Sequence, residues 1–234
     1  LDWHGNMSNY LNSKLKIFKL QTKNQFALIN KNLKKIFLKN NFLSKIIVPE
    51  EKGYQRIMKN IKNNYLTSEI NTENMSFIYT FAKLLNIKEK SFISSMKSFK
   101  GLPHRFEIFL KKENIVFIND SKATSFKATE PALRSLNNIY WILGGLPKKK
   151  DKIDISNFKK KIVKCYLIGN NVEFFKKQIK NRINFTITNN LKKTISSIIK
   201  DIKIKKDINK SILLSPAAAS FDQFKNFEKR GNEF

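Results

Sequence analysis

Hydrophobic residues in the second half of the chain recur in short apolar runs that are separated by segments with helical spacing. The runs are rich in Ile, Val, Leu and aromatic residues, which is typical of strands buried in a sheet. We predict strands at residues 115–119, 139–145, 164–169, 184–188 and 211–215, and helices at 171–180, 191–202 and 221–231. Strands that alternate with helices form mostly parallel sheets with helices on both faces. The pattern therefore predicts an α/β fold.

The first hundred residues also show helical and strand patterns, in a less regular order. Amphipathic helices are predicted at residues 7–20, 72–87 and 88–99, the second with Asn71 or Thr72 as its N-cap, and short strands at 25–30 and 44–49. Residues 51–66 are too polar to assign. Gly and Pro punctuate residues 101–105, "GLPHR", and the pattern changes after them. We therefore predict two domains, at residues 1–100 and 101–234.

The composition excludes several classes of protein. A chain of 234 residues can bury the core of one large domain or two modest ones. Its single cysteine, Cys165, rules out a disulfide within the chain, and two histidines without paired cysteines give no zinc site. No apolar run approaches the roughly 20 residues of a membrane helix. We expect no membrane partner and a cytoplasmic location.

A net charge of +28 makes nucleic acid a partner to consider, because lysines that neutralise phosphates provide sequence-independent affinity. The lysines, however, are spread along the whole chain among Asn, Ile and Phe residues, and no Arg-rich block stands out. This distribution is more typical of a genome-wide drift in composition than of a binding surface. We expect no nucleic-acid partner, and a basic nucleic-acid-binding α/β protein is the alternative function.

Polar or small residues follow three of the predicted strands where each one ends, at residues 119–122, 144–148 and 215–220. In parallel sheets ligands bind outside the carboxyl ends of the strands. Asp120 can accept a hydrogen bond from a ribose hydroxyl, and Lys122 can neutralise phosphate oxygens. From spacing alone, helix caps, a solvated loop and tight strand-to-helix packing are the better explanations. The chain contains no G-x-x-x-x-G-K-[ST] phosphate-binding loop.

A resemblance to a known family favours ligand binding over these structural explanations. Four motifs resemble those of the Mur ligases and follow the same order: "GLPHRFE", "NDSKAT", "LGGLPKK" and "LLSPAAASFDQFKNFEKRGNEF". The opening "LDWHG" and "YLNSKLKIF" resemble the central domain of the same family. The resemblance implies that residues 1–100 are the second half of a central ATPase domain. It also implies that residues 101–234 are most of a Rossmann-like carboxyl-terminal domain. The phosphate-binding loop and the nucleotide-sugar domain are expected outside this sequence.

The resemblance also implies a reaction in peptidoglycan synthesis, carried out by a monomeric enzyme. In the family member that adds D-glutamate, ATP phosphorylates the carboxylate of UDP-N-acetylmuramoyl-L-alanine, and the amine of D-glutamate attacks the acyl phosphate. Mg²⁺ offsets the negative charge. The closing motif is the one most particular to this member, and it argues against ligases for other amino acids and against folylpolyglutamate synthase. The present chain alone is expected to be inactive.

The resemblance assigns roles to individual residues. Lys14 matches a lysine that holds a second Mg²⁺ when carbamylated, and the catalytic set comprises Lys14, Arg105 and Lys122. The ATP-binding set comprises Asn71, Asn74, Arg105, Asp120 and Lys122, although the histidine often found beside the asparagines is Ile70 here. The D-glutamate set comprises Thr124, Lys148, Ser220, Phe221 and Phe227. His4 is not assigned a role, because the family's metal-binding histidine would precede Leu1.

Overall fold

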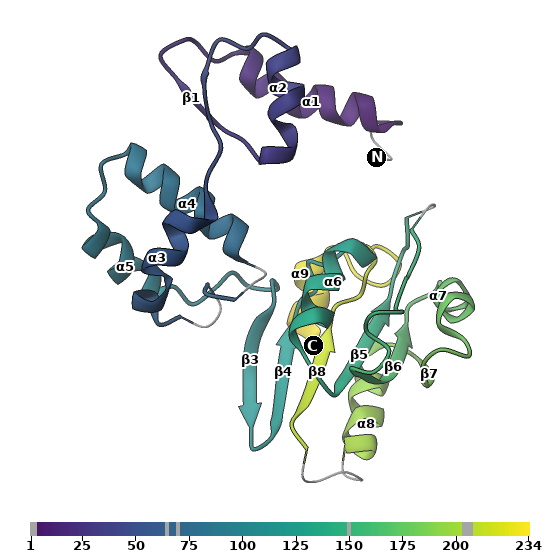
Figure 1. The fold of residues 1–234 in the computed structure, drawn as a ribbon. Coiled ribbons are helices and arrows are strands. Elements are labelled where there is room, and N and C mark those ends of the chain that lie inside the picture. The colour runs from purple at the N-terminus through teal and green to yellow at the C-terminus, as the bar shows by residue number, and fades with distance from the viewer. Residues whose placement is uncertain (1–3, 64–65, 69–70, 149–150, 203–207) are drawn as a thin grey trace. The chain divides into compact units, whose positions relative to one another are not determined.

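The computed structural model describes residues 4–63, 66–68, 71–148, 151–202 and 208–234, and the chain forms two compact units (Figure 1). The first unit is Leu1–Phe99 and the second is Lys100–Phe234. This boundary lies beside the "GLPHR" segment in which the linker was expected. The interpretation of the first unit as half of an ATPase domain stays a prediction.

The second unit is built on a six-stranded sheet with the order β3-β4-β8-β5-β6-β7. Neighbouring strands of this sheet are parallel, except that β3 pairs with β4 in the antiparallel direction. The strands are β3 (Glu107–Lys112), β4 (Ile115–Asn119), β5 (Ile139–Gly144), β6 (Ile162–Ile168), β7 (Phe185–Asn189) and β8 (Lys210–Leu214). The predicted α/β fold with a mostly parallel sheet is confirmed, and β3 is the strand that the prediction lacked.

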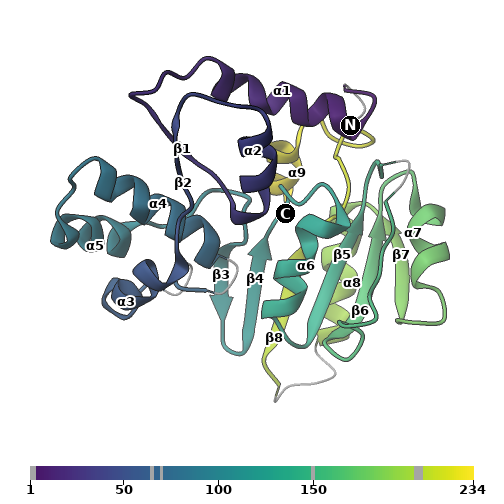
Figure 2. The same cartoon turned by 45° about the horizontal axis from the view of Figure 1, so that its top comes forward.

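Among the described residues of this unit, four helices accompany the sheet: α6 (Phe126–Ser135), α7 (Val172–Ile179), α8 (Leu191–Ile202) and α9 (Phe227–Glu233). Figure 2 shows α6 and α8 on opposite faces of the sheet. Side chains alternate along each strand, so Trp141 packs with residues of α6 and α7 while its neighbour Tyr140 packs with residues of α8. Both faces are therefore covered, as apolar parallel strands require. Cys165 is a fully buried core residue, and burial raises the pKa of its thiol.

The first unit contains a two-stranded parallel sheet, β1 (Phe26–Leu28) and β2 (Lys45–Ile47). Its helices are α1 (Met7–Lys19), the short 3₁₀ helix η1 (Lys31–Leu33), α2 (Lys34–Lys39), α3 (Glu51–Ile61), α4 (Thr72–Leu84) and α5 (Glu89–Ser98). Helix α3 covers most of residues 51–66, for which the sequence pattern predicts no element. It was missed because only Tyr54, Ile57 and Ile61 of its residues are buried, and the rest of the helix is mostly polar.

Asn71 occupies the N-cap position of α4, as predicted, but its side chain makes no capping hydrogen bond. Within the part of the chain that the structure describes, every helix is too short or too polar to cross a bilayer.

Candidate active site

The carboxyl ends of four neighbouring strands form a continuous edge in the second unit. Asp120 follows β4, Ser215 follows β8, and Gly145 and Gly169 follow β5 and β6. The order of the sheet places these strand ends side by side. The amide of Asp120 also donates to Leu214 O at 2.7 Å, which joins the first two ends directly. The sheet therefore gathers the polar segments that the sequence analysis selected at this edge, which is where such sheets bind ligands.

Asp120 is a half-buried carboxylate at this edge, directly after β4. Ser215 Oγ donates to Asp120 Oδ2 at 2.7 Å, and the amide of Phe106 donates to Asp120 Oδ1 at 3.2 Å. Burial raises the pKa of Asp120 to about 6, although both hydrogen bonds and the positive charge of Arg105 act in the opposite direction. The structure thus brings two of the predicted nucleotide-binding residues, Arg105 and Asp120, close enough to interact electrostatically.

Ser215 links Asp120 to the core, a role that the sequence analysis did not assign. Its hydroxyl lies 2.9 Å from Thr129 Oγ1, and its carbonyl accepts a hydrogen bond from Trp141 Nε1 at 2.8 Å. All three residues are completely buried. The only sequence signal for this role was a hydroxyl residue placed directly after an apolar strand.

Arg230, in α9, is the largest buried charge near this edge, and only 1% of it is exposed. Its guanidinium donates to Ser121 Oγ at 3.0 Å, to Ser121 O at 2.8 Å and to Ala218 O at 3.0 Å. Burial lowers the pKa of Arg230 to about 10, and Asp222 opposes this change. One side chain therefore ties the segment after β4 to the segment after β8.

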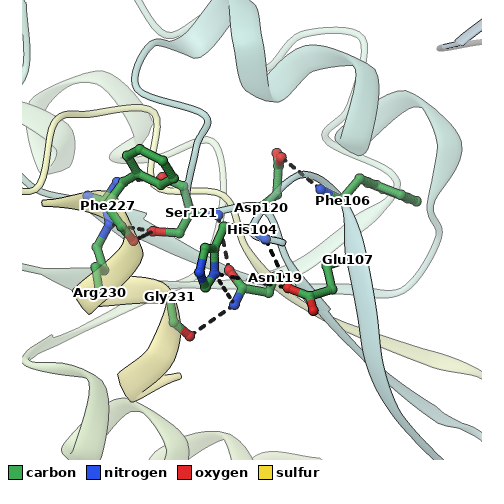
Figure 3. A network of polar contacts seen from close by, with 9 residues as sticks. All are labelled: His104, Phe106, Glu107, Asn119, Asp120, Ser121, Phe227, Arg230 and Gly231. Carbon is green, nitrogen blue, oxygen red and sulfur yellow. Dashed lines mark hydrogen bonds and ion pairs between the residues drawn. The ribbon is translucent and has the colours of Figure 1, made fainter. Parts of the chain in front are cut away.

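Helix α9 is attached to the same segment at several further points, which Figure 3 shows from close by. Ser121 Oγ donates to Phe227 O at 2.8 Å, and Asn119 Nδ2 donates to Gly231 O at 2.9 Å. Gly231 is required here because an added Cβ would lie 2.2 Å from His104 Nδ1. The end of the chain thus fixes the position of the "NDSK" turn.

His104 closes this network from the linker side. Asn119 Oδ1 accepts from the amide of Ser121 at 3.2 Å, so its Nδ2 must face both Gly231 O and His104 Nδ1, the latter at 3.1 Å. His104 Nδ1 is then an acceptor, and we assign its ring proton to Nε2. His104 O in turn accepts a hydrogen bond from the amide of Lys122 at 3.0 Å.

The small-residue turn after β8 runs across three strand ends. Leu146 and Ala219 exchange backbone hydrogen bonds of 2.8 and 3.0 Å, and Asp222 Oδ2 accepts from the amide of Asn170 at 2.9 Å. Gln223 Nε2 donates to the carbonyl at the end of β7, Asn189 O, at 2.8 Å. Helix α9 begins at Phe227 rather than at residue 221, so residues 221–226 form part of this crossing segment. The amide of Ala219 is used within the fold and is not directed at a ligand.

The residues predicted to hold D-glutamate all follow strands of this unit but differ in exposure. Ser220 is buried, Thr124 and Phe227 are half-buried, Lys148 is exposed, and Phe221 is 70% exposed. The pairing of Leu146 with Ala219 brings the segments of Lys148 and Ser220 together. The "LGGLPKKK" run continues through Lys149 and Lys150, which lie outside the described residues.

The predicted residues of the first unit are Lys14, Asn71 and Asn74. Lys14 is exposed in α1, and its Nζ lies 5.5 Å from the centroid of the Tyr10 ring. Asn71 Nδ2 donates to Ser68 Oγ at 3.4 Å, and Asn74 is exposed on α4. Ile70, the departure noted beside them, lies outside the described residues.

A pocket of about 830 Å³ opens at the carboxyl ends of β1 and β2 in the first unit. Its lining comes from the segments that follow these strands and from the first turns of α3 and α4. The lining includes Asn30, Glu50, Glu73, Ser76 and Phe77, but neither Asn71 nor Asn74.

The architecture of this chain is similar to that of proteins of known structure. No family model matches the chain. It is similar in fold to the MurF ligase from Thermotoga maritima in complex with ADP, with a TM-score of 0.60 and 13% identity over 99% of this chain and 59% of that one. MurF from Acinetobacter baumannii gives a TM-score of 0.52 over 71% of this chain and 38% of that one, at 14% identity. These structures show the fold, and 34% identity over the whole chain to a curated Mur ligase shows the family: the chain belongs to the Mur ligases.

Proteins that are similar to the chain in sequence belong to one member of this family, the ligase for D-glutamate. The chain is 34% identical over 256 residues to the UDP-N-acetylmuramoylalanine–D-glutamate ligase of Rickettsia felis, covering all of this chain and 57% of the relative. It is 39% identical over 164 residues to the ligase of the same name from Rhizobium meliloti, covering 70% of this chain and 35% of the relative. The chain matches the carboxyl-terminal part of such ligases and spans about half the length of the curated relatives it matches.

Proposed function

We propose that this chain is the carboxyl-terminal half of an ATP-dependent ligase that adds D-glutamate to UDP-N-acetylmuramoyl-L-alanine in peptidoglycan synthesis. The observation that carries the proposal is the 34% identity over the whole chain to ligases of that name. The edge formed by the ends of β4, β8 and β5 supports it, because it holds acidic, basic and hydroxyl groups suited to both co-substrates. We propose further that the full-length enzyme is cytoplasmic and monomeric.

Arg105, Asp120 and Lys122 form the end of the site that fits ATP. The Asp120 carboxyl, with a pKa of about 6, is mostly ionised at neutral pH and can accept a hydrogen bond from a ribose hydroxyl. Lys122 and the exposed Arg105 provide positive charge for phosphate oxygens. A cation that contacts a phosphoryl group during transfer lowers the barrier by roughly 3 to 4 kcal/mol, which is the role we propose for Lys122.

The D-glutamate end is proposed to use Lys148 and Thr124 for the α-carboxylate and the segment from Ser220 to Phe227 for the side-chain carboxylate. A lysine and two hydroxyls are suitable donors to carboxylate oxygens. Ser220 is only 2% exposed. The side-chain carboxylate of D-glutamate must therefore approach its hydroxyl through the turn that carries the half-buried Phe227 and the exposed Phe221.

Mg²⁺ is the second cofactor proposed. No group of three or more His, Cys, Asp or Glu residues that could hold a metal ion occurs among the described residues. Lys14 can contribute only after carbamylation, which converts its ammonium into an anionic oxygen ligand of the kind Mg²⁺ prefers.

The test is phosphate release from ATP by the full-length protein that contains this chain. Release should require both UDP-N-acetylmuramoyl-L-alanine and D-glutamate, and L-alanine or a diamino acid should not replace D-glutamate. Lys122→Ala should abolish most of this activity without unfolding the protein. Lys127→Ala, which removes an exposed lysine of α6, is the matched control and should retain it. Release that is indifferent to D-glutamate would disprove the proposal.

The comparisons do not favour the nucleic-acid alternative. A nucleic-acid-binding protein should bind duplex DNA with an affinity that falls steeply as the salt concentration rises from about 50 to about 200 mM. A measurement of DNA affinity across that range separates the two functions.

A further inference from the structure

Lys122 and Phe227 make a contact that the proposed function leaves unexplained. Lys122 Nζ lies 3.7 Å from the centroid of the Phe227 ring, which is well inside the range of roughly 6 Å over which a cation is attracted to an aromatic face. Both residues are half-buried. None of the ion pairs found in the described part of the chain includes Lys122. The aromatic ring is thus the partner that the structure shows for this ammonium group.

The contact is held from both sides by the network of Figure 3. On the lysine side, the amide of Lys122 donates to His104 O, and the preceding residue, Ser121, is held by Arg230. On the ring side, Phe227 O accepts from Ser121 Oγ, and Arg230 lies one turn further along the same helix. The two backbones are therefore fixed relative to each other, which keeps the ring within reach of the ammonium group.

An aromatic partner has a different consequence for Lys122 from that of a carboxylate. A carboxylate would hold the ammonium by cancelling its charge, and a phosphate would then have to compete with it. The face of a phenyl ring attracts the cation through its quadrupole and adds no net charge. Lys122 is therefore oriented at the edge of the sheet while its full positive charge stays available to an anion.

We propose that Phe227 is a positioning residue that orients Lys122 for the phosphates of ATP. This rests on the proposed function and deepens it, because Phe227 would serve the nucleotide end of the site in addition to the D-glutamate end. The ring and the ammonium then link the two ends, since Phe227 lies in the segment expected to hold the amino acid.

The test replaces Phe227 with mono-, di- and trifluorinated phenylalanine in the full-length protein. Fluorine withdraws electron density from the face of the ring and hardly changes its size. The readout is the affinity for a non-hydrolysable ATP analogue, measured by equilibrium binding, which does not depend on turnover. We expect the affinity to fall stepwise with each fluorine, by about 2- to 30-fold over the series, and Phe227→Leu to reach the same limit.

Two controls separate positioning from packing. The same series in a Lys122→Met background should show no trend, because the cation is gone. Phe109→Leu removes a phenyl ring that is 45% exposed on β3 and should leave the affinity unchanged. In addition, ¹³C-labelled lysine should give an upfield-shifted signal for the Lys122 side chain in the wild type, and Phe227→Leu should abolish that shift.

Either of two results overturns the inference: an affinity that is flat across the fluorine series, or a trend that persists without Lys122. The first would leave Phe227 as a packing or D-glutamate contact only. Failure of the proposed function itself would be seen separately, as an absence of D-glutamate-dependent phosphate release by the wild-type protein.

Discussion

Replacing Asp120 with asparagine should stabilise the second unit at neutral pH and leave its stability near pH 4 unchanged. The reason is the burial of this carboxyl, which raises its pKa from 3.8 to about 6 despite the hydrogen bonds from Ser215 and Phe106. Asparagine keeps an oxygen acceptor at the same place and carries no charge. The substitution therefore removes the cost of ionising a buried group while retaining most of the local contacts.

The sign and the size of the effect follow from linkage. Between about pH 4 and pH 6 the unfolded chain has lost the Asp120 proton and the folded chain still holds it. The free energy of unfolding therefore falls as pH rises through this window and levels off above it. At ~1.4 kcal/mol per pH unit, a rise from 3.8 to about 6 corresponds to at most ~3 kcal/mol. Asp120→Asn should gain up to this amount at pH 7.5.

The assay uses the fluorescence of Trp141 to measure unfolding by urea at a series of pH values from 4.5 to 8. This residue is buried beside Ser215, and a Trp3→Phe background makes it the only tryptophan. Other groups titrate equally in both proteins, so the difference between the two profiles isolates Asp120. Asp154→Asn is the matched control, because hydrogen bonds from Ser156 lower the pKa of that exposed carboxyl. Parallel profiles for wild type and Asp120→Asn would refute the reasoning.

Three further outcomes are expected. Arg230→Met should lower the free energy of unfolding by about 3 to 5 kcal/mol in the same urea assay. The reason is that the buried carbonyls of Ser121 and Ala218 and the Ser121 hydroxyl lose their hydrogen-bond donor, and a loss below about 1 kcal/mol would contradict this. Gly145→Ala should destabilise the second unit, since its Cβ would lie 2.3 Å from a backbone oxygen at φ +131°. Gly53→Ala, in the first turn of α3, should stabilise the chain by about 0.5 to 1 kcal/mol, because its Cβ would lie 3.8 Å from the nearest side-chain atom, Tyr79 Cε1; equal effects at the two glycines would be inconsistent with this. Ser215→Ala removes a hydrogen bond that lowers the pKa of Asp120, so the acid limb of kcat/KM for ATP should move to higher pH in the full-length enzyme; an unmoved limb would separate Asp120 from nucleotide binding.

The sequence predicted the second unit well because most of its parallel strands are short apolar runs bounded by turn residues, as in β4 and β5. The length of such runs, their flanking residues and their content of β-branched and aromatic residues distinguish them from helices. Strand β3 escaped because Glu107–Lys112 is an exposed edge strand with charged residues at its ends. Helix α3 escaped for a related reason, since a helix that buries only three residues carries little apolar periodicity. The boundary between the two units was visible because Gly and Pro mark it.

The candidate site was predicted only as far as strand ends reveal it. Asp120 and Lys122 stand out because charged residues directly after an apolar strand need an explanation. Arg230 does not stand out, because in sequence it is one more basic residue in a polar helix, and its burial depends on contacts with segments about a hundred residues away. Ser215 is likewise an ordinary hydroxyl until the sheet order places it beside Asp120. Contacts between segments this distant leave no local pattern.

The segment from Ala219 to Gln223 spans three strand ends in only five residues, with one attachment at each. Its length is consequently set by the spacing between strands, and adding or deleting one residue would detach at least one of them. Asp222 and Gln223 attach through their side chains, so this stretch is constrained in sequence at those two positions as well as in length. Insertions in natural variants should accumulate in other loops.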